Sequence, residues 1–223
     1  MKTKHLLGIL MLFSFIVSCT EQQCIINGTT TDVKDGDYMY IADLNDNTYL
    51  DSAVVMNGKF RFELPKASEE DFLPKKIVTA LGNKPSVAFV FTQDSEVKYI
   101  RDSNKEIFDI YGSPNNDLFR IENIKTDSIS HVLGHLDNLR LKDSTLTQVQ
   151  KDSITLKMNE LMKEDSILSI QSIERNLDNL VGAYLLYINR HSINKETFQR
   201  LFERLPQKYS SSKYFDDVRD NLK

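Results

Sequence analysis

The sequence predicts an α+β fold, with an antiparallel β-sandwich or barrel-like domain first and a helical region after it. In residues 24–112, short apolar-alternating runs are separated by Asn-Gly, Asp-Gly and Asn-Asp-Asn, which is typical of antiparallel strands joined by tight turns. In residues 113–223, apolar residues instead recur every three or four positions, which is the spacing of amphipathic helices. The period changes at Gly-Ser-Pro-Asn-Asn, residues 112–116, and we predict the boundary between the two regions there.

The first 18 residues have the layout of a secretory signal peptide. Lys2 and Lys4 precede an uncharged apolar run from Leu6 to Val17, and a small residue follows it. The apolar run is too short for an ordinary membrane-spanning helix, which needs ~20 residues.

Ser18-Cys19 resembles a bacterial lipobox, in which the cysteine becomes the lipid-modified first residue of the mature protein. The alternative is a plain signal peptide with an incidental cysteine. We expect residues 1–18 to be removed, Cys19 to carry the lipid, and residues 19–23 to form a short tether to the membrane. Thr20 is not Asp, so we expect an envelope protein anchored in the outer membrane that faces the periplasm or the cell surface.

Asn57-Gly58 predicts the clearest hairpin of the β-rich region. Both residue types tolerate positive φ, so a two-residue type I′ turn can join the flanking strands. That turn would place Val55 opposite Phe60 and the following apolar residues on the same face.

Further strands are predicted where apolar runs lie between turn signals, which brings the total to about eight, as in a sandwich or partly closed barrel. Residues 65–76 are polar, contain two prolines and read as a loop. The later strand candidates are residues 77–81, 87–91, 97–100 and 107–111.

Two long amphipathic helices are predicted to form a hairpin after Pro114, with Asn115-Asn116-Asp117 as N-caps of the first. Residues 142–145 interrupt the apolar stripe and can cap the second helix. Shorter helices are predicted over residues 180–188, 194–205 and 215–222, and the first of these is apolar enough to be buried.

Two patterns resemble metal sites. His131 and His135 lie one helical turn apart and could chelate Zn²⁺ or Ni²⁺, but Val132 stands where a zinc protease helix has its glutamate. Residues 43–47 resemble the start of a calcium loop without its glycine and terminal glutamate. We interpret the first as surface histidines and the second as a turn, and expect no metal site.

Cys24 is the only thiol that remains once Cys19 is lipid-modified. A dithiol oxidoreductase needs a second cysteine, usually in C-x-x-C, so we interpret Cys24 as a small buried residue of the first strand. We also find no nucleophile motif and no glycine-rich phosphate loop. The sequence therefore predicts no catalytic residue and no cofactor site.

The formal charge of the 223-residue chain is −4, and removal of Lys2 and Lys4 with the signal peptide makes the mature chain more acidic. Nucleic-acid binding needs a basic patch or stripe, so we expect no nucleic-acid partner.

After the lipobox come five short motifs in a fixed order: Cys24–Thr29 (C-x-I-x-G-T), Asp35-Gly36, Leu50–Ala53 (LDSA), Asn57–Phe60 (NGKF) and Ala183–Leu186 (AYLL). Together these motifs resemble lipoproteins of the Bacteroides group that carry an N-terminal domain of unknown function. In many of them a thioredoxin-like thiol–disulfide oxidoreductase domain follows. The Trp-Cys-x-x-Cys site of that domain has no counterpart before Lys223, so the resemblance implies only the targeting and accessory portion.

Three functions remain open at this point. The first is a non-enzymatic, envelope-anchored accessory or binding lipoprotein that contacts the membrane through its lipid and another envelope protein through its folded part. The second is a component of a thiol–disulfide redox pathway that acts with a separate thioredoxin-like partner. The third is an enzyme whose site has no familiar motif.

Overall fold

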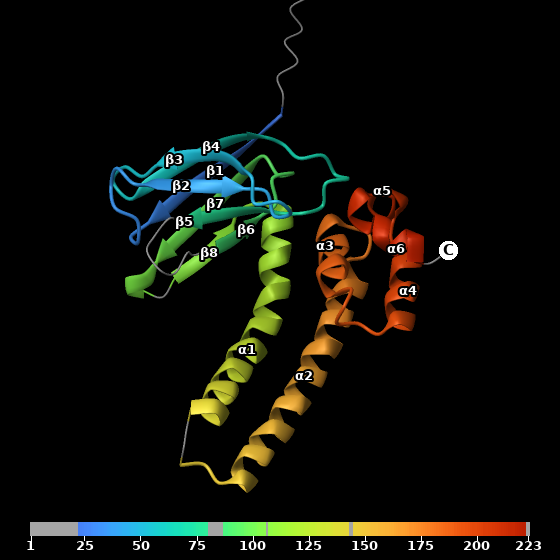
Figure 1. Cartoon of the computed structure of the whole chain (residues 1–223). Helices are drawn as coiled ribbons and strands as arrows, with labels where there is room; N and C mark the ends of the chain where they lie inside the picture. Colours follow the sequence, from blue (N-terminus) through green and yellow to red (C-terminus); the bar gives the residue numbers. More distant parts are fainter. Residues whose placement is uncertain (1–21, 80–86, 106, 143–144, 222–223) are drawn as a thin grey trace, which may run out of the picture.

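The computed structural model describes residues 22–79, 87–105, 107–142 and 145–221 (Figure 1). The predicted signal peptide and Cys19 lie outside these residues, as does part of the predicted break at residues 142–145.

Within the described residues, eight strands form two four-stranded sheets. One sheet has the order β4-β1-β7-β8 and the other the order β3-β2-β5-β6. The predicted α+β class is therefore confirmed. The strands are β1 (Gln23–Thr30), β2 (Tyr38–Ala42), β3 (Tyr49–Val54), β4 (Lys59–Pro65), β5 (Lys75–Thr79), β6 (Val87–Val90), β7 (Glu96–Asp102) and β8 (Ile107–Tyr111).

The two sheets share one core, because one cluster of buried side chains includes residues from strands of both sheets. In the first sheet, buried residues alternate with more exposed ones along β1, β4 and β7. The pairing is antiparallel except between β1 and β7, which run parallel. The prediction of a wholly antiparallel sandwich was wrong at this pair, because the chain passes through the second sheet before β7 returns beside β1. The shared core contains Cys24, Ile26, Met39, Ile41, Phe60, Phe62, Ile77, Val90, Val97 and Tyr99, among others.

The Asn57-Gly58 turn is confirmed, since the two residues have φ of 52° and 67°. The ladder predicted beyond it was wrong. Only Met56 and Lys59 pair across the turn, and the strands then separate into different sheets. The amide of Val55 bonds instead to Asp37 of the segment before β2, so this hairpin forms a corner between the sheets.

Helices follow the last strand directly. Figure 1 shows α1 and α2 as a long antiparallel hairpin that extends away from the sheets, with α3 to α6 gathered beside its base. None of the described helices combines the length and apolar character required to cross a bilayer. The helices are α1 (Pro114–Lys142), α2 (Gln148–Asn176), α3 (Leu180–Asn189), α4 (Lys195–Glu203), α5 (Gln207–Ser210) and α6 (Asp216–Asn221), with a 3-10 turn over Lys213–Phe215.

The helix ends follow local capping rules. Thr147 begins α2 in a capping box with Gln150, and Asn179 and Asn194 cap α3 and α4 through their side chains. The predicted caps of α1 were placed too late, since the helix already begins at Pro114, whose fixed φ suits a first helical position. The predicted short helices are confirmed, α3 as the buried one.

A second core lies among the helices, and the β-rich region contributes to it. Phe72 and Leu73, which the sequence placed in a polar loop, are buried there, as is Phe91 at the end of β6. Phe91 makes ring contacts with Phe119 and Tyr184, at centroid distances of 5.3 and 5.6 Å. The helical core is therefore completed by residues from the other half of the chain.

Candidate functional site: the cleft between the sheets and the helices

A cleft of about 760 Å³ lies where the sandwich meets the helices. Its walls come from six separate stretches of the chain, so it exists only when both halves are folded together. The walls are formed by Gln22 before β1, residues 65–69 after β4, Gln93 and Asp94 after β6, Asn115 in α1, residues 178–180 at the start of α3, and Lys208 and Tyr209 in α5.

Asp94 forms the polar floor of the cleft and is only 9% exposed. Its carboxylate accepts bonds from the backbone and side-chain nitrogens of Asn115, at 3.1 and 2.9 Å, and from Asn116 Nδ2 at 3.3 Å. A carboxylate at the start of a helix also interacts favourably with the helix dipole. The first turn of α1 is therefore fixed to the segment after β6.

Asn116 extends this floor into the sandwich. Its side-chain amide accepts from the Phe91 backbone N–H and donates to the Phe91 carbonyl, both at 2.9 Å. At the end of β6, this side chain therefore makes the two backbone hydrogen bonds that a neighbouring strand would otherwise make. These bonds satisfy buried backbone groups that would otherwise be unpaired, and they hold the floor in one arrangement.

The rim of the cleft carries both signs of charge. Lys208 of α5 forms an ion pair of 2.5 Å with Glu69, which links the helical wall to the sandwich wall. Lys66 donates to Ser95 Oγ at 2.6 Å, and Asp178 lies just before α3. Because both members of the Lys208–Glu69 pair are substantially exposed, the pair can separate at little cost in free energy.

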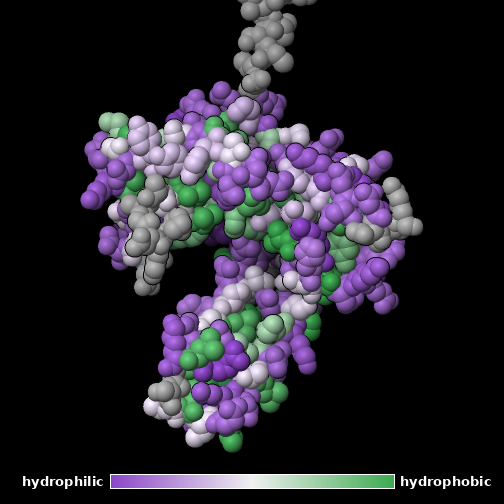
Figure 2. All heavy atoms as spheres, viewed as in Figure 1, coloured by the Kyte–Doolittle hydropathy of each residue, from purple (hydrophilic) through white to green (hydrophobic). Residues whose placement is uncertain are grey.

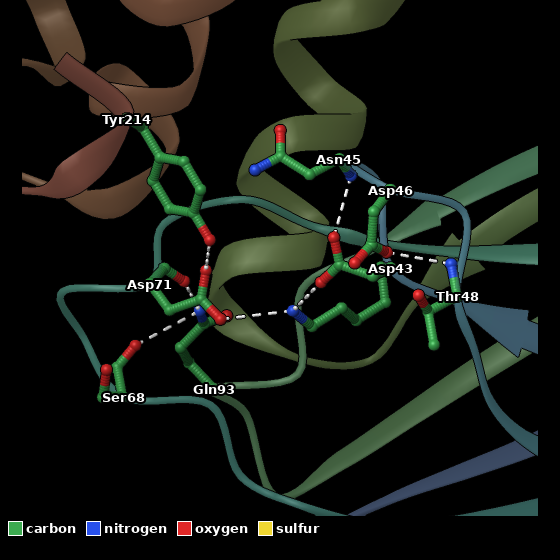
Figure 3. A network of polar contacts seen from close by, with 9 residues as sticks. Asp43, Asn45, Asp46, Thr48, Ser68, Asp71, Gln93 and Tyr214 are labelled. Atoms are coloured by element: carbon green, nitrogen blue, oxygen red, sulfur yellow. Dashed lines mark hydrogen bonds and ion pairs between the residues drawn. The ribbon is translucent and has the colours of Figure 1, made fainter. Parts of the chain in front are cut away.

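A polar network beside the cleft joins the same two walls (Figure 3). Lys75 of β5, whose side chain is 12% exposed, contacts Asp43 at 3.0 Å and Asp71 at 3.2 Å. Tyr214, from the 3-10 turn before α6, donates to the other oxygen of Asp71 at 2.5 Å. Asp71 therefore connects a sandwich lysine with a helical-region tyrosine.

Lys75 and Tyr214 both remain protonated in this network, as expected of residues that serve to hold the structure together. Burial opposes the charge of Lys75, but Asp43 and Asp71 outweigh it and raise the pKa of the lysine above its usual value. Burial, together with the hydrogen bond to Asp71, likewise raises the pKa of Tyr214. Both groups therefore keep their protons at neutral pH, as ties between the two halves must.

Neither of the two sequence patterns that resemble metal sites lines the cleft. His131 and His135 are exposed on the α1 side of the hairpin, and the described residues contain no cluster of three metal-ligating side chains. Residues 43–47 form the expected turn, in which Asp43 accepts from the Asn45 amide at 2.8 Å and Asn47 has a φ of 62°.

Cys24 is fully buried in β1, as the sequence predicts. Burial raises the pKa of its thiol to about 11, and the nearby charge of Asp94 acts in the same direction. A thiol of this kind remains protonated at neutral pH and is a poor nucleophile.

Sequence analysis missed the cleft, because its walls are distant in the chain and carry no motif. The only local signal is the pair of polar segments at 93–94 and 115–116, each of which lies a few residues after an apolar strand. Neither indicates by itself that Asp94 and Asn115 lie together.

Part of the chain matches a known family model. Residues 24–119 match the family model described as "Domain of unknown function (DUF4369)". No curated protein and no solved structure matches the chain. The matched range covers nearly all of both sheets and ends in the second turn of α1, and so includes Asp94, Asn115 and Asn116. Residues 24–119 therefore form a DUF4369 domain, and the rest of the helical hairpin and the helices after it lie beyond the match.

Proposed function

We propose that this chain is a lipid-anchored lipoprotein of the cell envelope that serves as a non-catalytic accessory or binding module, with the cleft as its binding site. The observation that supports this most is the cleft itself. It has a fixed polar floor, and its volume of about 760 Å³ lies within the range of ligand pockets, which is ~300–1,000 Å³.

The position of the cleft suits a protein held at a bilayer. Gln22, at the edge of the cleft, lies only three residues after Cys19, so a lipid on Cys19 would be within roughly 10 Å of it. The strand that follows, β1, starts at the end of the molecule opposite the tip of the α1–α2 hairpin (Figure 1). In this proposal the cleft therefore lies near the membrane and the hairpin extends away from it.

Metabolic labelling with an alkyne fatty acid tests the anchor. The wild type should be labelled and recovered with membranes, whereas Cys19→Ala should lose the label. Cys24→Ser is the matched control and should keep it, because Cys24 is buried in the folded domain. Equal labelling of the wild type and Cys19→Ala would contradict the lipoprotein proposal.

Site-specific photo-crosslinking tests the binding role. A photoreactive amino acid at Ser68, an exposed residue of the cleft wall, should yield a defined adduct in whole envelopes. The same amino acid at Ser130, exposed on α1 away from the cleft, should not yield it. Identical products at both positions, or none at Ser68, would argue against the cleft as the binding site.

The alternative proposal, a role beside a separate thioredoxin-like partner, is based on the family resemblance. The buried thiol of Cys24 gives it no chemical support, so in that case the chain would act as the docking subunit and the partner would supply the thiols.

A further inference from the structure

The strand β6 has a free edge that faces a groove beside α1. It is the last strand of its sheet, with β5 as its only neighbour in the described part of the chain. A groove of about 420 Å³ lies between this edge, β8 of the other sheet and the first turns of α1. Figure 2 shows apolar side chains at the surface over β5 and β6, where the sandwich approaches α1. No described residue lines both this groove and the cleft.

Asn116 pairs with this edge as a strand residue would. Its side-chain oxygen accepts from the Phe91 N–H and its side-chain nitrogen donates to the Phe91 carbonyl, both at 2.9 Å. The two backbone groups of Phe91 therefore point away from β5 and toward α1. Phe91 directly follows β6, and every second residue of a strand turns its backbone groups to the same side. The N–H and carbonyl groups of Phe89 and Val87 therefore also face the groove.

These groove-side groups have no partner among the described residues. The intervening residues, Ala88 and Val90, turn their backbone groups to β5 and form the ladder with it. On the other side of β6, no hydrogen bond to the backbone of Val87 or Phe89 occurs in the described ranges. A free edge of this kind is a template for an extended segment, whose own amides pair with the exposed N–H and C=O groups.

The side chains around the groove are mostly apolar. Phe108 of β8 and Ile124 of α1 are 52% and 58% exposed there, and Val87 and Phe89 of β6 are also partly exposed. Large apolar side chains that gather around one depression are typical of a binding surface. A strand laid along β6 would cover them with every second side chain that it carries.

The charged residues of the groove leave a small excess of negative charge. Its described lining contains Asp109, Arg120 and Asp127. Arg120 donates to Asp109 at 3.3 Å, whereas no ion pair to Asp127 occurs among the described residues. A basic side chain on the occupant would complement this charge, and an acidic one would be repelled.

The helix α1 limits what can reach the edge of β6. Residues between 116 and 127 of this helix form one wall of the groove. A second folded sandwich would have to displace that wall to bring its own edge strand against β6. A single extended segment paired along the four residues of β6 is only ~13 Å long and lies ~4.8 Å from the strand. The geometry therefore favours a single segment over the sheet edge of a second copy.

We propose that the groove binds an extended segment of a partner protein, which adds a strand to β6 and continues the pairing that Asn116 begins. The segment has apolar side chains at alternate positions and a basic residue beside Asp127. The proposal depends neither on the cleft nor on the lipid anchor.

A random-peptide phage library, selected against the soluble mature chain that begins at Thr20, tests the proposal. We expect the selected peptides to alternate apolar residues, to include Lys or Arg and to lack acidic residues. Val87→Pro removes a groove-side N–H at the first residue of β6, where proline is tolerated, and should weaken peptide binding by about tenfold in fluorescence anisotropy. Val87→Thr is the matched control, which keeps the N–H and a β-branched side chain and should bind as the wild type does.

A second pair of variants leaves β6 intact. Ile124→Glu places a negative charge on the α1 wall of the groove and should also weaken binding. Ile121→Glu is its control, because Ile121 is 49% exposed on the same helix but does not line the groove. Circular dichroism checks that all four variants keep the wild-type fold.

Two N-methylated forms of one selected peptide separate backbone pairing from side-chain contact. One form is methylated at the odd positions and the other at the even positions. Because only every second N–H of an added strand faces β6, one form should lose binding and the other should keep it. The proposal is overturned if the library yields no binder, if both methylated forms bind equally, or if Val87→Pro and Ile124→Glu bind the peptides as tightly as the wild type.

Discussion

Gly58 illustrates how one residue sets the corner between the two sheets. Its φ is 67°, and a Cβ added there would lie 2.9 Å from the carbonyl oxygen of Thr30. Its amide also donates to Asp35 Oδ1 at 3.0 Å, and its carbonyl accepts from Thr30 at 2.8 Å. The conformation is thus held by two bonds as well as by the turn type, and only its sequence signature, Asn-Gly, is visible without the structure.

Gly58→Val should therefore destabilise the protein by about 1–3 kcal/mol, because a β-branched residue resists positive φ and clashes with Thr30. Urea unfolding followed by circular dichroism measures this. Gly134→Ala is the control, since Gly134 lies in α1 with nothing within 4 Å of an added Cβ. That change should stabilise the helix by about 0.5–1 kcal/mol. Equal effects of the two substitutions would show that the turn is not strained.

Asp165 is a single residue whose desolvated carboxylate lowers the stability of the folded protein at neutral pH. Desolvation raises its pKa, and its buried Oδ1 accepts no hydrogen bond from the described residues. A carboxyl group with a raised pKa in the folded state favours folding most below its unfolded pKa of ~3.9, and the benefit is lost as pH rises through the folded pKa. At neutral pH the ionised group therefore costs stability.

Asp165→Asn should raise the melting temperature at pH 7 and leave it nearly unchanged at pH 3. Thermal unfolding at both pH values measures the difference, and Asp152→Asn, an exposed position in the same helix, serves as the control. A gain of equal size at both pH values would mean that ionisation of Asp165 is not the cause.

At the scale of elements, the segment between β4 and β5 ties the two halves together. Phe72 is fully buried, and its ring lies 5.2 Å from that of Tyr214 and 5.3 Å from that of Phe215. The neighbouring Asp71 bonds to both Lys75 and Tyr214. This segment has the composition of a loop, yet it inserts the ring of Phe72 into the helical core.

Phe72→Ala should cost about 3–5 kcal/mol, the usual penalty for removing a buried aromatic side chain. Hydrogen exchange should then show lost protection in α3, α5 and α6, with β1, β4 and β7 largely unaffected. Phe89→Ala is the control, because Phe89 is 36% exposed on β6. Loss of protection spread evenly over both sheets would indicate that Phe72 does not stabilise the helices selectively.

The same elements show what sequence reasoning reaches. Turn residues and helix caps act within a few positions, so the Asn57-Gly58 turn and most helix boundaries were predictable. Sheet membership was not, because β3 and β4 are adjacent in sequence yet belong to different sheets, β3 beside β2 and β4 beside the more distant β1. The burial of Phe72 and the meeting of Asp94 with Asn115 likewise depend on long-range packing that no local period records.

At the scale of the whole molecule, the two cores are separate but not independent. The chain changes from strand to helix between Tyr111 and Pro114, close to the predicted boundary. Phe72 and Phe91 nevertheless cross it to complete the helical core. The cleft follows from this arrangement, because its floor is formed where the segment between β6 and β7 is bonded to the first turn of α1.

The whole fold also bears on thiol chemistry, and we expect the soluble chain from Thr20 not to catalyse disulfide exchange. Exchange through an intramolecular disulfide needs an attacking thiolate and a resolving thiol, and Cys24 would be the only thiol present. It is buried between the sheets, and its pKa of about 11 leaves few thiolates at pH 7. An aromatic disulfide reagent should modify it only after unfolding in guanidinium. Insulin reduction by dithiothreitol should proceed at the background rate, and a faster rate that Cys24→Ser abolishes would return this chain to the oxidoreductases. If insulin reduction stays at the background rate but the thiol of the native protein reacts at once, the sandwich opens around β1, and the burial of Cys24 does not explain its inertness in exchange.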